Sequence, residues 1–338
     1  MARPADHGVL LMRRRRFLGW ALGGAVVAAA AGTAGFELVN HGVLPGKSEL
    51  DALDGACALE ATDFVSYAAP GPEISGTFYS AARNREVGYT IGYPPGHGPG
   101  DALPLVVMLH GEGGNHANAL PGLTPARAVA LRVPRFSAAP PSSSSSSASS
   151  SGAVTADGAG GEAPLPPLAL VTVDGGTGYW NAHPGDDPMG MLTGELIPLC
   201  QRRGLGGAPH RIGAMGISMG GFGALLLAEK HPDLISAVAV ISPAVWTSYA
   251  QARAVNPGAY AAAADFAADD AVTHASALAD KPVRIASGFD DPFRPGVEAL
   301  VQKLPKDAVV EFAKGCHDGS FFTEQEPPSL AFLGSHVA

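Results

Sequence analysis

Cysteines and charged residues are both scarce in this sequence, and each scarcity narrows what the chain can be. Three of its 338 residues are cysteines, Cys57, Cys200 and Cys316. They form no CxxC pair and no Cys/His ligand spacing, so we expect neither a disulfide framework nor a structural zinc site. One disulfide is compatible with the sequence, which does not select the pair. We predict no metal and no cofactor.

Basic residues are the scarcer of the charged types. The chain has 22 Lys and Arg against 31 Asp and Glu, a formal net charge of -9. Five of the basic residues and one acidic residue lie in the first 35 positions, so the remainder carries 17 basic and 30 acidic residues. A body this acidic repels phosphate backbones, which argues against nucleic-acid binding. Hydrophobic residues make up 46% of the chain, enough to bury a substantial core.

The N-terminus has the pattern of an export signal. Residues 14–18 read RRRFL, which matches two arginines, any residue, then Phe-Leu. An uncharged stretch rich in Ala and Gly follows from Phe17 to Phe36. We predict a twin-arginine-type signal over residues 1–36, with the twin-arginine export machinery as a partner. The protein would then be secreted or associated with the cell envelope, and an uncleaved N-terminal membrane anchor is the alternative.

The pattern of apolar runs after the N-terminal signal predicts one catalytic domain. Residues 37–75 read as a loosely packed lead-in, and residues 76–336 as an α/β domain. Two strands at 76–80 and 87–93 suggest a hairpin. Apolar runs typical of strands buried on both faces occur at 105–110, 168–173, 212–215, 237–241, 283–286 and 308–312. Helical segments are expected at 189–202, 221–230 and 296–303. This alternation predicts a mostly parallel central sheet with helices on both faces.

One segment interrupts the alternation. Residues 137–167 hold a block of serines followed by Gly, Ala and Pro, with very few bulky apolar residues. Such a composition buries too little surface to offset the entropy of ordering, so we predict a disordered insert. A glycosylated or wall-threading stretch is the functional alternative.

The strongest motif is GISMG at residues 216–220. It follows a short predicted strand and precedes a predicted helix, which is the setting of a strand–turn–helix nucleophile elbow. Ser218 is therefore the candidate nucleophile. The helix that follows places its N-terminus close to this serine, where it favours developing negative charge.

A serine needs a base, and in this arrangement the acid and then the histidine follow it in the chain. Of the histidines after Ser218, His231 ends the helix that starts at the nucleophile, His274 lies in an Ala-rich helical stretch, and His336 is in the terminal tail. His317 follows the last predicted strand and is the candidate base.

The candidate acid lies in the loop after the strand at 283–286. That loop reads SGFDDPF and offers Asp290 and Asp291. We favour Asp291, because Pro292 biases it toward an extended conformation that suits a side chain presented from a strand end.

An oxyanion hole needs two backbone amides. We assign them to Met219 and to Glu112, with Gly113 as the alternative to Glu112, in the loop that follows the strand at 105–110. The Glu112 side chain has no assigned role beyond a solvated loop charge.

Two aromatic residues and one polar turn complete the candidate site. Tyr179 and Trp180 follow another strand end and are assigned to substrate binding, with structural packing as the alternative for Trp180. His183, Asp186 and Asp187 resemble metal ligands but read better as a polar turn.

In these stretches the chain resembles the esterase D/antigen 85-like branch of the α/β-hydrolases, particularly secreted actinobacterial esterases. The matching residues are LHG at 109–111, DGG at 174–176 with Tyr179-Trp180, GISMGG at 216–221, GFDDPF at 288–293 and GCHD at 315–318. The Ser-rich insert and the cysteine before His317 depart from the family pattern. The resemblance implies an α/β-hydrolase fold and cleavage of a small-molecule or lipid carboxylic ester through an acyl-enzyme, without metal. A mycolyltransferase-type acyltransferase and a non-catalytic wall-associated binding protein are the alternatives, and the sequence indicates no oligomeric state.

Overall fold

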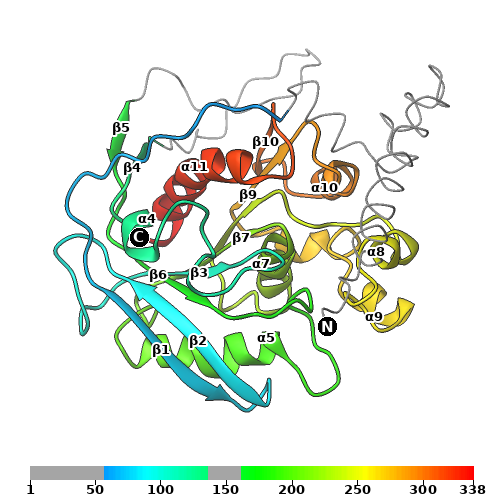
Figure 1. Ribbon diagram of the computed structural model, residues 1–338, viewed down its shortest axis with the longest axis horizontal. Coiled ribbons are helices and arrows are strands. Elements are labelled where there is room, and N and C mark those ends of the chain that lie inside the picture. The colour runs from blue at the N-terminus through cyan, green and yellow to red at the C-terminus, as the bar shows by residue number, and fades with distance from the viewer. Residues whose placement is uncertain (1–56, 136–160) are drawn as a thin grey trace, which may run out of the picture. The chain divides into compact units, whose positions relative to one another are not determined.

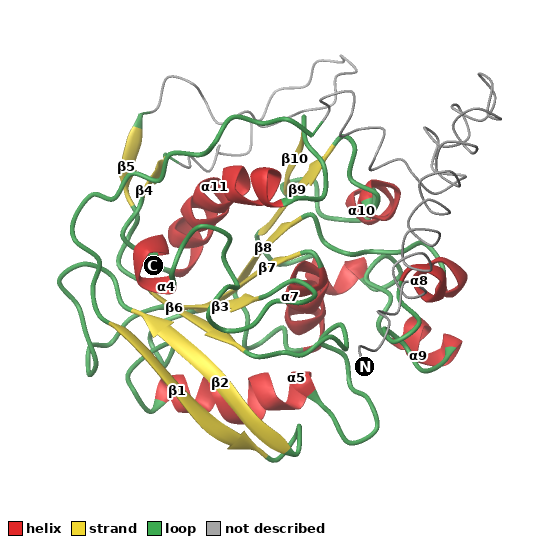
Figure 2. Ribbon diagram, in the orientation of Figure 1, coloured by secondary structure: helices red, strands yellow, loops and turns green. Residues whose placement is uncertain are grey.

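The computed structural model describes residues 57–135 and 161–338. An eight-stranded sheet runs through them in the order β1-β2-β6-β3-β7-β8-β9-β10 (Figures 1 and 2). Its strands are β1 Glu73–Ser80, β2 Arg85–Gly92, β3 Leu105–Leu109, β6 Ala169–Val173, β7 Ile212–Ile217, β8 Ala237–Ile241, β9 Val283–Gly288 and β10 Val309–Ala313. The β1–β2 and β2–β6 pairs are antiparallel, and every pair from β6 to β10 is parallel.

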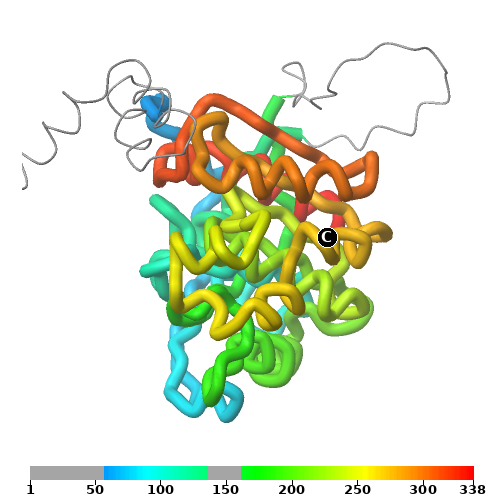
Figure 3. The backbone as a smooth tube through the Cα atoms, turned by 90° about the vertical axis from the view of Figure 1, so that its right-hand side faces the viewer, coloured from blue at the N-terminus to red at the C-terminus, as the bar shows by residue number. Residues whose placement is uncertain are grey.

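Helices cover both faces of this sheet. They are α4 Pro125–Ala128, α5 Pro188–Met191, the π-helical turn η1 Leu192–Leu196, α6 Ile197–Gln201, α7 Met219–Lys230, α8 Tyr249–Val255, α9 Ala263–Ala268, the 3-10 turn η2 Ala275–Leu278, α10 Arg294–Val301 and α11 Gly319–Val337. In the side view of Figure 3, the yellow segment that carries α8 and α9 lies toward the viewer. No helix in the two described ranges is long and apolar enough to cross a membrane.

The continuous apolar runs form the buried strands because both of their faces are covered. All five residues of β3, β6 and β8 are buried. Alternate side chains of β3 enter two cores: Val107 and Leu109 pack on the α7 side, whereas Val106 and Met108 pack on the α11 side. The predicted parallel sheet and its three predicted helices are confirmed, with boundaries shifted by a few residues.

The lead-in contacts the main domain at several points. β1 begins at Glu73, so the sheet starts before the expected boundary at residue 76. Ahead of it, the Tyr67 amide donates a hydrogen bond to the Ala130 carbonyl at 2.9 Å, and Phe64 packs on the α11-side core. A disulfide joins Cys57 to Cys316, which leaves Cys200 as a buried free thiol. These contacts attach residues 57–75 to the domain, and every residue in this range stays partly or fully exposed.

The end of the predicted disordered insert is also ordered. Residues 161–167 include β5 Glu162–Pro164, which pairs antiparallel with β4 Arg132–Pro134. Leu165, the one large apolar residue near this end, is buried with 1% of its surface exposed. Its burial and the strand pairing order this end of the segment. The rest of the insert, 137–160, lies outside the described residues, as do the predicted signal and residues 37–56.

The last helix was not predicted. α11 contains Pro327 and Pro328, and proline in a helix interior usually disrupts the helix. Asp318 caps its N-terminus, because its carboxylate accepts hydrogen bonds from the amides of Ser320 and Phe321. His336 therefore lies in a helix and not in a terminal tail.

Candidate active site

Ser218 lies at the sharp turn between β7 and α7. Its backbone has φ 55° and ψ -120°, a strained conformation for a residue with a side chain. Glycines permit the turn to be this tight. A Cβ on Gly216 would lie 2.0 Å from the Gly220 carbonyl oxygen, and one on Gly220 would lie 1.9 Å from the Leu109 carbonyl oxygen. The GISMG spacing therefore meets a packing requirement at both flanks of the serine.

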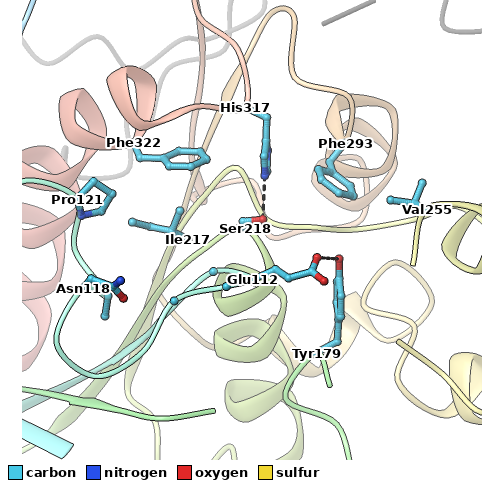
Figure 4. A pocket seen from close by; sticks show the side chains of 14 residues that line it. Glu112, Asn118, Pro121, Tyr179, Ile217, Ser218, Val255, Phe293, His317 and Phe322 are labelled. Carbon is cyan, nitrogen blue, oxygen red and sulfur yellow. Dashed lines mark hydrogen bonds between the residues drawn. The ribbon is translucent and has the colours of Figure 1, made fainter. Parts of the chain in front are cut away.

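His317 connects this serine to a buried carboxylate (Figure 4). Its Nε2 lies 2.8 Å from Ser218 Oγ, and its Nδ1 lies 3.0 Å from Asp291 Oδ2. Because a carboxylate only accepts, Nδ1 carries the proton and Nε2 is left to accept one from the serine hydroxyl. The structure thus brings together the three residues that the sequence placed at the ends of three different strands.

Asp291 is the aspartate that contacts the histidine. Its side chain is fully buried, and its Oδ1 accepts a hydrogen bond from the Phe293 amide at 2.8 Å. Asp290 is partly exposed, and its amide donates to the Gly315 carbonyl. The preference for Asp291 over Asp290 agrees with this geometry.

Two aromatic rings and the disulfide hold the histidine. The Phe293 ring lies 5.0 Å from the His317 ring, and Phe322, from the first turn of α11, meets it edge-on at 5.2 Å. The preceding residue, Cys316, is bonded to Cys57. The two rings and the disulfide therefore restrict the position of the loop that carries His317. Neither phenylalanine was predicted, although the Pro-Phe pair beside Asp291 was a usable signal for Phe293.

The two assigned oxyanion donors belong to segments that adjoin the serine. Met219 is the first residue of α7, where a helix has backbone amides without intrahelical partners. Glu112 follows Gly111, and a Cβ on Gly111 would be 3.5 Å from Ser218 Cβ, so this loop passes directly beside the nucleophile.

His110 supports this loop, a role the sequence analysis did not assign. Its Nδ1 donates to the Gly111 carbonyl at 2.7 Å, and its Nε2 accepts from the Gly175 amide at 2.8 Å. Burial lowers the pKa of His110, which keeps the ring neutral and able to make both bonds. In the sequence, the position of His110 directly before Gly111 was the one feature that could have indicated this supporting role.

A cleft of about 510 Å³ opens above Ser218 and His317. Its lining is mixed, with glycines of the Glu112 loop on one side and apolar side chains on the other. The side chains that face it include Asn118, Pro121, Tyr179, Ile217, Val255, Phe293 and Phe322 (Figure 4). The space and its lining suit a small apolar group next to the serine.

Tyr179 and Trp180 have different surroundings. Tyr179 lines the cleft, and its hydroxyl lies 3.5 Å from Glu112 Oε2. Burial and the nearby Glu112 carboxylate raise the pKa of Tyr179 to about 12, so it remains a neutral hydrogen-bond donor. Trp180 is completely buried: its ring packs against Gly175 and Gly223, and its Nε1 donates to the His110 carbonyl. The substrate-binding assignment of Trp180 is therefore corrected to a core residue.

The polar turn at residues 183–187 is structural in this fold. His183 and Asp186 exchange backbone hydrogen bonds, Asp186 pairs with Arg83 at 2.7 Å, and Asp187 caps α5. Among the described residues, the one set of side chains close enough to share a metal ion is Cys57, Cys316 and Asp318. Its two sulfurs are joined in the disulfide, so they are not thiolate ligands.

Residues 181–294 match the model of a protein family described as "Putative esterase". The matched segment contains Ser218 and Asp291 and ends before His317. The chain is an esterase of the α/β-hydrolase fold. No curated protein sequence matches it.

Solved structures share the fold of this esterase at low sequence identity. S-formylglutathione hydrolase from Agrobacterium tumefaciens is 17% identical, with a TM-score of 0.56 over 83% of this chain and 100% of that chain. The fluorophosphonate-binding serine hydrolase FphF from Staphylococcus aureus is 14% identical, with a TM-score of 0.56 over 79% and 99%. MPT51 from Mycobacterium tuberculosis is 16% identical, with a TM-score of 0.53 over 79% and 100%. These similarities establish the fold.

Proposed function

We propose that Ser218, His317 and Asp291 are the catalytic triad of this esterase, which hydrolyses carboxylic esters through an acyl-enzyme. The observation that carries the proposal is the unbroken chain of hydrogen bonds from Asp291 through His317 to Ser218, at the floor of an open cleft. The strained turn at Ser218 supports it further, because such strain persists where function requires it.

The reaction follows from this geometry. Ser218 Oγ attacks the ester carbonyl carbon while His317 Nε2 takes the hydroxyl proton. The amides of Met219 and Glu112 donate to the carbonyl oxygen as it becomes negative. His317 then gives the proton to the departing alcohol, and the C–O bond to that alcohol breaks. Water then attacks the acyl carbonyl carbon while His317 Nε2 takes its proton, and His317 returns that proton to Ser218 Oγ as the acyl–Oγ bond breaks and the acid is released.

Transfer to an acceptor alcohol would differ only in the second nucleophile. An alcohol in place of water would give a new ester, as in the acyltransferase alternative. Product analysis with and without an added alcohol separates the two outcomes, since hydrolysis releases one free acid for each ester consumed.

Labelling with a fluorophosphonate probe tests the nucleophile, and the similar fold of FphF, described as fluorophosphonate-binding, suggests the reagent. We expect labelling at Ser218 and a loss of p-nitrophenyl butyrate hydrolysis of about 10⁴-fold to 10⁶-fold in Ser218→Ala. Ser276→Ala, an exposed serine in η2, is the matched control. Folded wild-type protein that is neither labelled nor active would favour the non-catalytic binding alternative. Activity of Ser218→Ala within about tenfold of wild type would exclude Ser218 as nucleophile.

We further propose that the protein is exported by the twin-arginine route. The Cys57–Cys316 disulfide supports this, because stable disulfides are typical of oxidising compartments. Replacing Arg14 and Arg15 by lysine should retain the protein in the cytoplasm, measured by cell fractionation. Unchanged export of this variant would refute the route.

A further inference from the structure

A second cleft adjoins the catalytic cleft. Its volume is about 350 Å³, and its lining includes Arg85, Thr177, His183, Asp186 and Asn256. Glu112 lines both clefts. The Glu112 side chain therefore stands between the space above Ser218 and the second space.

Hydrogen bonds hold Glu112 in this position. Its Oε1 accepts from Asn256 Nδ2 at 3.0 Å, and its Oε2 lies 3.5 Å from the Tyr179 hydroxyl. The bond to Asn256 joins the loop after β3 to the loop after α8, 144 residues apart in the chain. Figure 4 shows the Glu112 carboxylate turned toward Tyr179.

The two clefts have opposite chemical character. The catalytic cleft is lined by several apolar side chains, among them Ile217, Phe293 and Phe322. The second cleft has none among its described lining residues, which present hydroxyl, imidazole, carboxamide, guanidinium, carboxylate and backbone groups instead. Such a lining binds a group that makes hydrogen bonds.

Two arginines share the carboxylate of Asp186 at the second cleft, and Glu112 is the other carboxylate that lines it. The Arg85 guanidinium lies 2.9 Å from Asp186 Oδ2, and the buried Arg83 also binds Asp186. The partners of the Glu112 carboxylate are instead the uncharged Asn256 and Tyr179. The Glu112 carboxylate, which lines both clefts, thus has two uncharged hydrogen-bond partners.

We propose that Glu112 determines substrate specificity by charge: the ester accepted here carries an uncharged, hydrogen-bonding group in the second cleft, and carboxylate- or phosphate-bearing esters are rejected. This inference rests on the proposed function and adds the substrate class. The physical reason is repulsion between like charges in a partly enclosed space, where solvent screens them less than in bulk water.

Two esters of matched shape test the role of the charge. 4-Carbamoylphenyl butyrate has a neutral carboxamide, and 4-carboxyphenyl butyrate has a carboxylate in the same place. The measured quantity is the ratio of kcat/KM for the anionic ester to that for the neutral ester. Comparing this ratio between variants cancels the intrinsic reactivity of the two esters.

Glu112→Gln removes the charge and keeps an oxygen that accepts from Asn256. We expect the ratio to rise roughly tenfold, the size expected for two like charges about 10 Å apart near a protein surface. Glu298→Gln is the matched control, because it removes the same charge from a partly exposed pair with Arg294 on α10. The rise in Glu112→Gln should shrink with added salt.

Asn256→Ala separates the charge from the bridge. It breaks the hydrogen bond and leaves the carboxylate, so the rejection of the anionic ester should persist. An unchanged ratio in Glu112→Gln, or an equal rise in Glu298→Gln, would overturn the proposal. Hydrolysis of p-nitrophenyl butyrate that is lost in Ser218→Ala tests the proposed function separately, so an unchanged ratio refutes only the role of the Glu112 side chain.

Discussion

The hydrogen bonds of Asp291 predict a specific defect in Asp291→Asn. The Phe293 amide donates to Oδ1, and His317 Nδ1 donates to Oδ2. In the variant, the carboxamide oxygen must accept from the fixed backbone amide of Phe293. Its NH₂ group then faces His317 Nδ1, which must become an acceptor. The imidazole proton moves to Nε2, where it blocks acceptance of the Ser218 proton.

The expected loss follows from this trapped tautomer. Removing the base function while the serine, the oxyanion donors and the cleft remain should lower kcat about 10⁴-fold. That factor corresponds to about 5.5 kcal/mol of transition-state stabilisation. Because the carboxamide has the same shape as the carboxylate, KM should change far less than kcat.

Steady-state kinetics on p-nitrophenyl butyrate measures both parameters. Asp290→Asn is the matched control, since it changes the neighbouring carboxylate, and it should lose far less activity. The reverse ranking would move the acid to Asp290. Small and equal losses in both variants would mean that neither aspartate supports His317.

Three further predictions concern stability. Cys57→Ser opens a 259-residue loop, which by loop-closure entropy costs about 5 kcal/mol of unfolding free energy, so the Tm of the variant should lie about 10 °C below that of the oxidised wild type. Wild-type protein with the disulfide reduced should have the same Tm as the variant. A variant with the Tm of the oxidised wild type would refute the estimate. Burial raises the pKa of Glu326 well above its usual value of 4.5, and neither carboxylate oxygen has a hydrogen-bond partner among the described residues. At pH values between the unfolded and the folded pKa of Glu326, the folded state binds one more proton than the unfolded state, so the free energy of unfolding falls as pH rises. Measured by urea unfolding, this free energy should fall less from pH 5 to pH 8 in Glu326→Gln than in wild type. An identical fall in both proteins would contradict the prediction. Deletion of residues 140–158 should leave activity unchanged and Tm within about 2 °C, because so polar a segment contributes little to the core; a larger fall would contradict the composition argument.

The residues at strand ends could be predicted because topology alone brings them together. In a parallel sheet, loops that follow the strands meet at one edge, so Ser218, Asp291 and His317 needed only correct strand assignments. The glycines of the turn at Ser218 carried the rest of the signal. These features depend on chain order and backbone space, both of which a sequence records.

Side-chain direction and the last helix could not be predicted in this way. Tyr179 and Trp180 have positive φ angles of 55° and 62°. The directions of their two side chains therefore do not follow the periodicity of a strand or a helix. One lines the cleft and the other fills the core. α11 forms despite its two prolines because tertiary contacts hold it: the buried Arg284 guanidinium donates to Ser329 and Gln325 on this helix. Such contacts across the fold outweigh local propensity.

The disulfide also fixes an order of events in the life of the protein. Its two cysteines are 259 residues apart, so the bond can close only after nearly the whole chain has been synthesised. If the chain crosses the membrane folded, as its N-terminus predicts, it does so from a reducing compartment with both thiols free. The residue next to His317 would then acquire its covalent partner only on the far side. The oxidation state of Cys57 and Cys316 would therefore separate molecules that have been exported from those still waiting inside the cell.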